Sequence, residues 1–225
     1  MEKGTEHWSE ERAVRISAGA IELEGNLGVV EGAEGVVLFA HGSGSGRSSP
    51  RNLYVARVLR QAGLSTLLID LLTAEEEGVD LCTRQLRFDI GLLAERLVGA
   101  TGWLRDDPGT QNLRIGYFGA STGAGAALVA AAERPDEVGA VVSRGGRPDL
   151  AGEALSCVEA PTLLIVGGSD VPVIGMNEVA LGRMHVQKRL EIVPGATHLF
   201  EEAGALEEVA RLAAAWFGRY LALSA

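Results

Sequence analysis

The residue most able to do chemistry is Ser121, which lies within the run Gly-Ala-Ser-Thr-Gly at residues 119–123. The run follows a short apolar segment, 113–118, and precedes an alanine-rich segment of helical length, 122–133. A sharp turn between a strand and a helix would expose the serine hydroxyl in a strained backbone conformation. The flanking glycines suit such a turn because the strand and helix backbones pass close together there. The alternative is an ordinary Gly-Ser turn in which the serine caps the helix.

Two further residues can supply what a serine nucleophile needs. A serine hydroxyl is weak unless a base removes its proton, and a third group must orient that base. Asp170 follows the apolar segment 162–166 and two glycines, and His198 follows segment 189–193 within Pro-Gly-Ala-Thr-His. Taken alone, each is typical of a turn or a solvated loop. Their chain order after Ser121, each beyond the end of an apolar segment, predicts a common site for nucleophile, acid and base.

A loop rich in glycine and serine, residues 41–47, follows the apolar segment 36–40. Acyl transfer needs donors aimed at the developing oxyanion, each worth about 2.7–4 kcal/mol. We expect these donors to be the backbone N–H groups of Ser43 and of Thr122, the residue after the nucleophile. The loop lacks the Gly-Lys-Ser/Thr of a P-loop, and Arg47 stands where a dinucleotide-binding motif requires its third glycine. A nucleotide site is therefore disfavoured.

The elements that must position these residues alternate along the chain. Apolar segments of strand length, typical of strands buried on both faces of a parallel sheet, occur at 36–40, 64–69, 113–118, 138–142, 162–166 and 189–193. Segments of helical length and period occur at 52–62, 83–104, 122–133, 150–158 and 206–221. This alternation predicts an α/β fold with a mostly parallel sheet and helices on both faces. Residues 13–17 and 21–27 alternate in polarity across Ala18-Gly19 and predict an antiparallel edge hairpin.

The composition narrows the class of protein. The chain has 225 residues, of which 47% are hydrophobic and 22% are charged. This composition predicts a single globular domain that spans residues 1–225, and it excludes a disordered acidic chain. A formal net charge of −10 argues against nucleic-acid binding. Cys82 and Cys157 have no metal-ligand spacing and cannot make a disulfide scaffold. Residues 1–12 lack the apolar run of a signal peptide, and no membrane-spanning apolar stretch occurs, so we expect a cytoplasmic location.

From about Val14 to Leu221 the chain resembles α/β-hydrolases of the dienelactone hydrolase-like group. The motifs that carry the resemblance are His-Gly-Ser-Gly at 41–44, Gly-Ala-Ser-Thr-Gly at 119–123, Gly-Gly-Ser-Asp at 167–170 and Gly-Ala-Thr-His at 195–198. The resemblance implies a twisted sheet of about seven or eight strands, no large lid domain, no metal and no organic cofactor. It also implies hydrolysis of small esters or lactones. Dienelactone hydrolases use a cysteine nucleophile, so Ser121 favours a more general carboxylesterase.

Two arginines are candidates for substrate binding. Arg144 follows segment 138–142 and is therefore expected at the same edge of the sheet as the site. Its guanidinium could hold a substrate carboxylate bidentately, or it could tie down its own loop or Asp149. Arg47 has the same two interpretations. His41 is expected to hold its loop, because His198 already supplies the base.

Residues 71–80, with three consecutive glutamates, form the least regular stretch of the sequence. A run of acids is typical of a solvated loop, although its place after a strand leaves open that it lines the site. The intervals 70–82 and 143–161 are too short for a folded lid. We therefore expect an open, shallow site that hydrolyses short acyl groups no worse than long ones.

These observations predict a serine hydrolase that cleaves small carboxylic esters or lactones through an acyl-enzyme intermediate. Ser121 would attack the carbonyl, His198 would accept the proton, and Asp170 would orient the histidine. The alternatives are a hydrolase of thioesters or organophosphate esters using the same residues, and a catalytically silent scaffold acting as a receptor or interaction module. The expected partner is a small-molecule ester or lactone, with no nucleic acid and no membrane, and a homodimer is left open.

Overall fold

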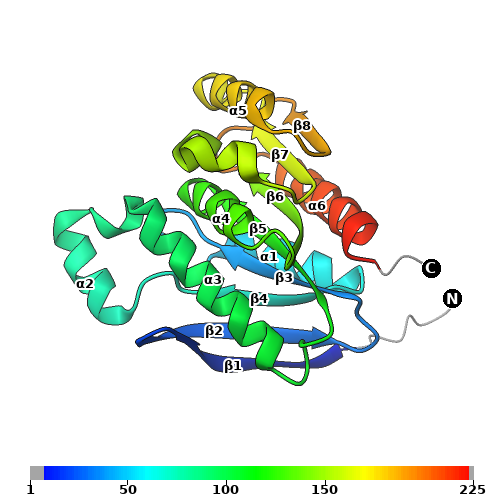
Figure 1. Ribbon diagram of the computed structural model, residues 1–225. Helices are drawn as coiled ribbons and strands as arrows, with labels where there is room; N and C mark the ends of the chain where they lie inside the picture. Colours follow the sequence, from blue (N-terminus) through cyan, green and yellow to red (C-terminus); the bar gives the residue numbers. More distant parts are fainter. Residues whose placement is uncertain (1–7, 223–225) are drawn as a thin grey trace, which may run out of the picture.

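The computed structural model describes residues 8–222, and its centre is an eight-stranded sheet (Figure 1). The strand order is β1-β2-β4-β3-β5-β6-β7-β8. The first two strands pair antiparallel with their neighbours, and all other neighbours are parallel. The strands are β1 (Trp8–Ala18), β2 (Ile21–Val30), β3 (Gly35–Ala40), β4 (Ser65–Ile69), β5 (Arg114–Ala120), β6 (Val138–Arg144), β7 (Thr162–Gly167) and β8 (Lys188–Val193).

Helices cover both faces of this sheet, as the sequence predicts. On one face pack α1 (Pro50–Gln61) and α6 (Ala205–Leu221); on the other pack α3 (Ile90–Asp106), α4 (Thr122–Glu133), η2 (Pro148–Cys157) and α5 (Val171–Arg183) (Figure 1). Every residue of β3, β4 and β7 is buried, because each strand is covered on both sides. The fold is therefore the predicted α/β-hydrolase fold, with flanking helices and no large lid domain.

The predicted edge hairpin is also present. β1 pairs with β2 in antiparallel register from Ala18 opposite Ile21 outward, and β2 continues the sheet by pairing with β4. Gly19 turns the chain at a φ of +67°, a left-handed conformation that glycine adopts without strain. The inner face of β2 is apolar and buried, so the hairpin extends the hydrophobic core to the edge of the sheet.

The structure corrects the prediction for residues 71–104. The acidic stretch is not a loop: it forms α2 (Ala74–Thr83), and the predicted helix 83–104 is divided into η1 (Leu86–Phe88) and α3. The cause is local. The Thr73 hydroxyl accepts a hydrogen bond from the Glu76 amide, and the Glu76 carboxylate accepts one from the Thr73 amide, which is a capping box. Arg84, at a φ of +55°, ends α2.

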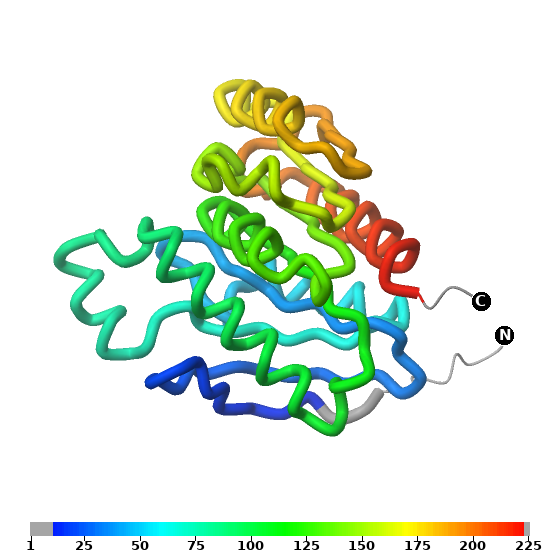
Figure 2. The backbone as a smooth tube through the Cα atoms, in the orientation of Figure 1, coloured from blue at the N-terminus to red at the C-terminus, as the bar shows by residue number. Residues whose placement is uncertain are grey.

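Figure 2 shows that α2 and the segments on either side of it project beyond the sheet, on the side where β3 and β4 end. The segment after β4 therefore contains a short helix, α2, which lies beside the loop that follows β3. The prediction also missed α5, whose start is marked by Pro172 near the first turn. Both helices follow the carboxyl ends of strands.

Two predictions concern the ends and the surface of the chain. In the part of the sequence that the structure describes, none of the helices is both long and apolar enough to cross a membrane. The stretch 1–12 lies mostly outside the described residues. Cys82 and Cys157 are exposed and unpaired with each other.

Candidate active site

Ser121 occupies the turn between β5 and α4 in a strained conformation. Its φ is +50° and its ψ is −121°, a region that residues other than glycine rarely adopt. The turn is held by contacts that exclude side chains at its two glycines. A Cβ atom at Gly119 would lie 2.4 Å from the Ala124 Cα atom, and one at Gly123 would lie 2.3 Å from the Ala40 carbonyl oxygen. The turn therefore has the strained strand–turn–helix geometry that the spacing of residues predicts.

Asp170 and His198 form a hydrogen-bonded pair. The Asp170 Oδ2 atom lies 2.7 Å from His198 Nδ1. Asp170 stands at the N-terminus of α5, yet its side chain makes no capping bond to that helix and reaches the histidine instead. The Asp170 side chain is 14% exposed and that of His198 is 39% exposed, so the acid is enclosed while the imidazole remains accessible. This pairing holds the Nδ1 proton and leaves Nε2 as an acceptor.

The loops that carry these residues meet beside the turn of Ser121. The Ser121 amide donates to the Arg144 carbonyl oxygen at 3.2 Å, which ties the turn to the end of β6. The next residue, Gly145, lies against the histidine loop, since a Cβ atom there would be 3.1 Å from the His198 carbonyl oxygen. Among the described residues the Ser121 hydroxyl has no hydrogen-bond partner. A serine–histidine bond of this kind often forms or tightens only when substrate binds.

The predicted oxyanion donors are neighbours. The Ser43 amide donates to the Thr122 hydroxyl at 3.0 Å, so the loop after β3 is tied to the first turn of α4. Thr122 is the first residue of α4, where backbone N–H groups have no partner within the helix. Gly42 lies directly against Ser121, because a Cβ atom at residue 42 would be 3.1 Å from the Ser121 Cβ atom. The Ser43 amide must share or release its bond to Thr122 to serve an oxyanion.

His41 holds the same loop in place. Its Nε2 atom accepts a hydrogen bond from the Leu71 amide at 3.0 Å, and its Nδ1 atom lies 2.9 Å from the Gly42 carbonyl oxygen. The imidazole is therefore neutral with its proton on Nδ1. Burial lowers the pKa of His41, although its bond to Gly42 and the charges of nearby acids oppose the shift. The geometry agrees with the structural role that the sequence predicts.

The two candidate arginines have different surroundings. Arg47 is paired with Asp70 and, at 2.6 Å, with Glu24. Its charge is thus already matched by two carboxylates, and the residue anchors the loop after β3 to the β2–β4 edge. Arg144 is buried, and Asp149 is not its partner, because Asp149 binds Arg147 through two hydrogen bonds of 2.8 Å.

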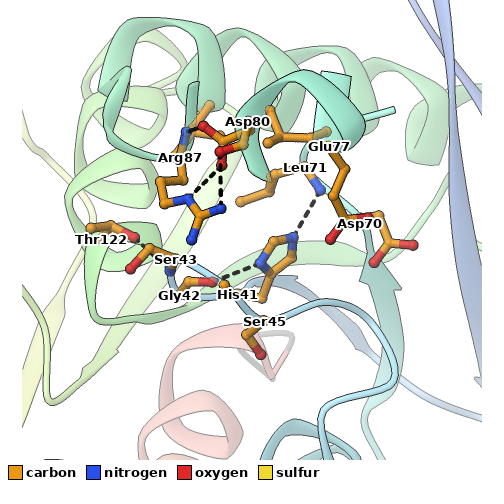
Figure 3. A pocket seen from close by; sticks show the side chains of 13 residues that line it. His41, Gly42, Ser43, Ser45, Asp70, Leu71, Glu77, Asp80, Arg87 and Thr122 are labelled. Carbon is orange, nitrogen blue, oxygen red and sulfur yellow. Dashed lines mark hydrogen bonds and ion pairs between the residues drawn. The ribbon is translucent and has the colours of Figure 1, made fainter. Parts of the chain in front are cut away.

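A small pocket of about 30 Å³ lies between the loop after β3 and α2 (Figure 3). Arg87 reaches over the loop from η1 toward Ser43, held by the buried carboxylate of Asp80. Hydrogen bonds from Arg87 lower the pKa of Asp80, although desolvation of the carboxyl opposes them. Sequence analysis missed this pair because neither residue has a motif around it. The capping box at Thr73 and Glu76 is the signal that could have revealed the helix carrying Asp80.

The parallel sheet, the strained serine turn after β5 and the acid–histidine pair beyond β7 and β8 define an α/β-hydrolase. The profile of the dienelactone hydrolase family matches residues 35–221, and the chain belongs to that family. A dienelactone hydrolase from Anabaena variabilis ATCC 29413 is 68% identical in sequence, with a TM-score of 0.94 over 96% of this chain and 100% of that one. Est1E from Butyrivibrio proteoclasticus shares the fold, with a TM-score of 0.78 at 15% identity over 94% of this chain and 99% of that one.

Curated relatives from Mycobacterium tuberculosis have a different name. In strains CDC 1551 and H37Rv, a protein named as a phosphoribosyl transferase is 58% identical over 204 residues. The match covers 91% of this chain but 45% of that protein. The chain thus spans less than half the length of these relatives.

Proposed function

We propose that the protein is a serine hydrolase of small carboxylic esters or lactones that works through an acyl-enzyme intermediate. The observation that carries the proposal is the 2.7 Å hydrogen bond between Asp170 and His198, on loops that adjoin the strained turn of Ser121. Membership of the dienelactone hydrolase family supports a hydrolase. The nucleophile is a serine, so we propose a carboxylesterase in place of the cysteine chemistry of dienelactone hydrolases.

The proposed reaction follows from the hydrogen bonds of the site. With its Nδ1 proton directed to Asp170, His198 accepts the Ser121 proton at Nε2 as the hydroxyl attacks the carbonyl carbon. Asp170 stabilises the imidazolium that results. The backbone N–H group of Thr122, together with that of Ser43, stabilises the oxyanion. His198 then protonates the leaving alcohol, and a water molecule activated by the same imidazole releases the acid.

The transferase name of the mycobacterial relatives is not part of this proposal. It belongs to a protein of which the matched segment is 45%, and most of this chain matches a hydrolase family. The size of the pocket beside Ser43 bears on the acyl group of the substrate. This small pocket favours short acyl groups, because it offers little enclosed apolar surface to stabilise a long acyl chain.

Pre-steady-state hydrolysis of p-nitrophenyl acetate, butyrate and decanoate tests the proposal. We expect a burst of about one p-nitrophenol per protein, followed by slower turnover, and a kcat/KM for acetate and butyrate at least equal to that for decanoate. His198→Ala should remove both the burst and the turnover. If the protein hydrolysed none of these esters but did hydrolyse p-nitrophenyl thioesters or paraoxon, its substrates would be of that class. If a fluorophosphonate labelled the protein but no substrate were hydrolysed, the protein would be a silent scaffold.

A further inference from the structure

Thr122 carries a hydroxyl group that accepts a hydrogen bond but has no acceptor for its own proton. The residue directly follows Ser121 and is 3% exposed. Its Oγ1 atom accepts the Ser43 amide at 3.0 Å. A hydroxyl can accept and donate at once, yet none of the described residues accepts a hydrogen bond from Thr122. Buried polar groups normally use their hydrogen-bonding capacity, so this free proton needs a physical explanation.

The position of Thr122 at the start of α4 explains why its proton is free. A threonine inside a helix can donate to the carbonyl oxygen four residues earlier. Thr101 in α3 does so, since its hydroxyl donates to the Leu97 carbonyl oxygen at 2.9 Å. For Thr122 the corresponding residue is Phe118, which belongs to β5 and not to the helix. The usual helical acceptor is therefore missing.

The hydroxyl borders the small pocket between the loop after β3 and α2. Thr122 and Ser43 both line this pocket, and Figure 3 shows them next to each other. Arg87, which reaches over the loop toward Ser43, has donors only and cannot accept the proton. An acceptor for the Thr122 proton would therefore have to enter with a ligand.

The proposed oxyanion would form close to this hydroxyl. Thr122 is the first residue of α4, so its backbone N–H group has no partner within the helix. In the proposed function this N–H group donates to the oxyanion. Only the Cα and Cβ atoms separate it from the hydroxyl oxygen, so both groups of Thr122 can reach one ligand oxygen. Gly42, in the same loop as Ser43, packs against Ser121 and brings that loop close to the reacting serine.

We propose that the Thr122 hydroxyl is a further catalytic group, which donates a hydrogen bond to the oxyanion in addition to the two backbone donors. The inference rests on the proposed function and assigns a side chain to it. The hydroxyl keeps its proton throughout and keeps the bond from Ser43. That bond makes it a better donor, because a hydroxyl that accepts a hydrogen bond is polarised. An oxyanion is a stronger acceptor than the ester carbonyl, so the bond acts mainly in the transition state.

Thr122→Val removes the hydroxyl and keeps the branched shape of the side chain, whereas Thr122→Ser keeps the hydroxyl. Burst-phase kinetics with p-nitrophenyl butyrate give the acylation rate constant. We expect Thr122→Val to lower it by about 10- to 100-fold, somewhat less than the usual loss for one oxyanion donor, because the released Ser43 amide replaces part of the bond. Thr122→Ser should stay within about fivefold of the wild type. Ester binding should change by less than about threefold in both variants, because the bond acts in the transition state.

A thionoester separates this role from a structural one. The substrate p-nitrophenyl thionobutyrate carries sulfur in place of the carbonyl oxygen, and sulfur is a weak hydrogen-bond acceptor. The loss caused by Thr122→Val should therefore be at least about fivefold smaller for the thionoester than for the butyrate. A general disturbance of the site would slow both esters by the same factor. Thr122→Ala removes the hydroxyl without leaving a branched side chain and should reproduce this difference.

Ser45→Ala is the matched control, because Ser45 lines the same pocket and its hydroxyl makes no hydrogen bond to the described residues. It removes no oxyanion donor, so it should change neither rate by more than about threefold. Faster acylation by Thr122→Val would mean that the hydroxyl merely occupies the Ser43 amide, and it would overturn the proposal. Equal losses on the two esters, or no loss on either, would also overturn it.

The behaviour of the wild type separates this inference from the proposed function. If the wild type shows a burst with the butyrate and Thr122→Val acylates at the same rate, only the role of the hydroxyl is refuted. If the wild type shows no burst and takes up no fluorophosphonate, the proposed function is refuted, and the role of the hydroxyl with it.

Discussion

Three residues near the proposed site owe their properties to their immediate surroundings. Asp170 forgoes a capping bond to α5 and contacts His198 at 2.7 Å, and His41 is kept neutral by burial and by the Leu71 amide that donates to its Nε2 atom. Ser121 is the third such case, because the close packing of the turn after β5 holds it at a positive φ. In each residue the arrangement depends on a few contacts that a single substitution can remove.

Asp170→Asn tests the role of the orienting acid. We expect kcat for p-nitrophenyl butyrate to fall by about 10⁴, because the amide stabilises the wrong histidine tautomer. Asp149→Asn is the matched control, since Asp149 follows β6 but binds Arg147. Steady-state kinetics of both variants give the answer. Near-normal turnover by Asp170→Asn, or an equal loss in Asp149→Asn, would remove Asp170 from the mechanism.

Among the elements, α2 shows how a short helix can be specified by a few side chains. Glu76 completes the capping box with Thr73 and also reaches Arg96 of α3 at 2.8 Å. Arg96 is buried, so this ion pair fixes α2 to the body of the protein. Because α2 lines the pocket beside Ser43, its position sets the shape of that pocket.

Glu76→Ala should loosen α2 because it removes the capping box and leaves Arg96 unpaired. A lost cap costs about 0.5–2 kcal/mol, so we expect amide hydrogen exchange in the peptide covering residues 74–83 to accelerate by about 2- to 30-fold. Glu75→Ala removes the same charge from the same turn but leaves the capping box and the ion pair with Arg96 intact. It should change the exchange rate of that peptide by less than about threefold. Equal rates in the two variants would contradict the anchoring role of Glu76.

The strands β3 to β7 were predictable because each is an apolar run covered on both faces. The predicted burial of the last strand was wrong, because β8 lies at the edge of the sheet and most of its residues are at least partly exposed. The positions of Ser121, Asp170 and His198 were predictable because each follows the end of such a run. α2 was not, since the glutamate run is typical of a solvated loop unless Thr73 is recognised as a cap. The burial of Arg144 could not be predicted either. It depends on how α1 packs over the end of β6, which is tertiary structure that no local pattern encodes.

For the molecule as a whole, the eight-stranded sheet brings distant segments to one edge. Ser121, Asp170, His198 and the loop of His41 all follow strands whose carboxyl ends lie at one edge of the sheet. A contact that holds this edge should therefore influence the stability of the entire fold. His41 is such a contact, because it links the loop after β3 to the chain after β4.

His41 should make the protein sensitive to acid. Folding lowers its pKa below the ordinary value of 6.5, so the unfolded chain binds the proton more readily. The stability it contributes is complete above about pH 6.5 and is lost as the pH falls further, by up to about 1.4 kcal/mol per pH unit. Urea unfolding of wild type and His41→Gln between pH 7.5 and 5.0 measures this.

The variant should show a flatter decline below pH 6.5 than the wild type. His185→Gln, which changes an exposed histidine, should keep the wild-type slope. If His41→Gln and the wild type lost stability in parallel over this range, the neutral, buried state of His41 would be wrong.

The central claim is that Ser121 is the nucleophile, and covalent labelling tests it most directly. The protein is treated with a fluorophosphonate, digested, and the modified residue located by mass spectrometry. We expect one adduct per molecule, on Ser121, that forms faster than on denatured protein and is prevented by a saturating ester substrate. Ser121→Ala should remain folded, take up no label and retain less than a tenth of wild-type turnover. An adduct on another residue, or ester turnover that survives in Ser121→Ala, would contradict the account.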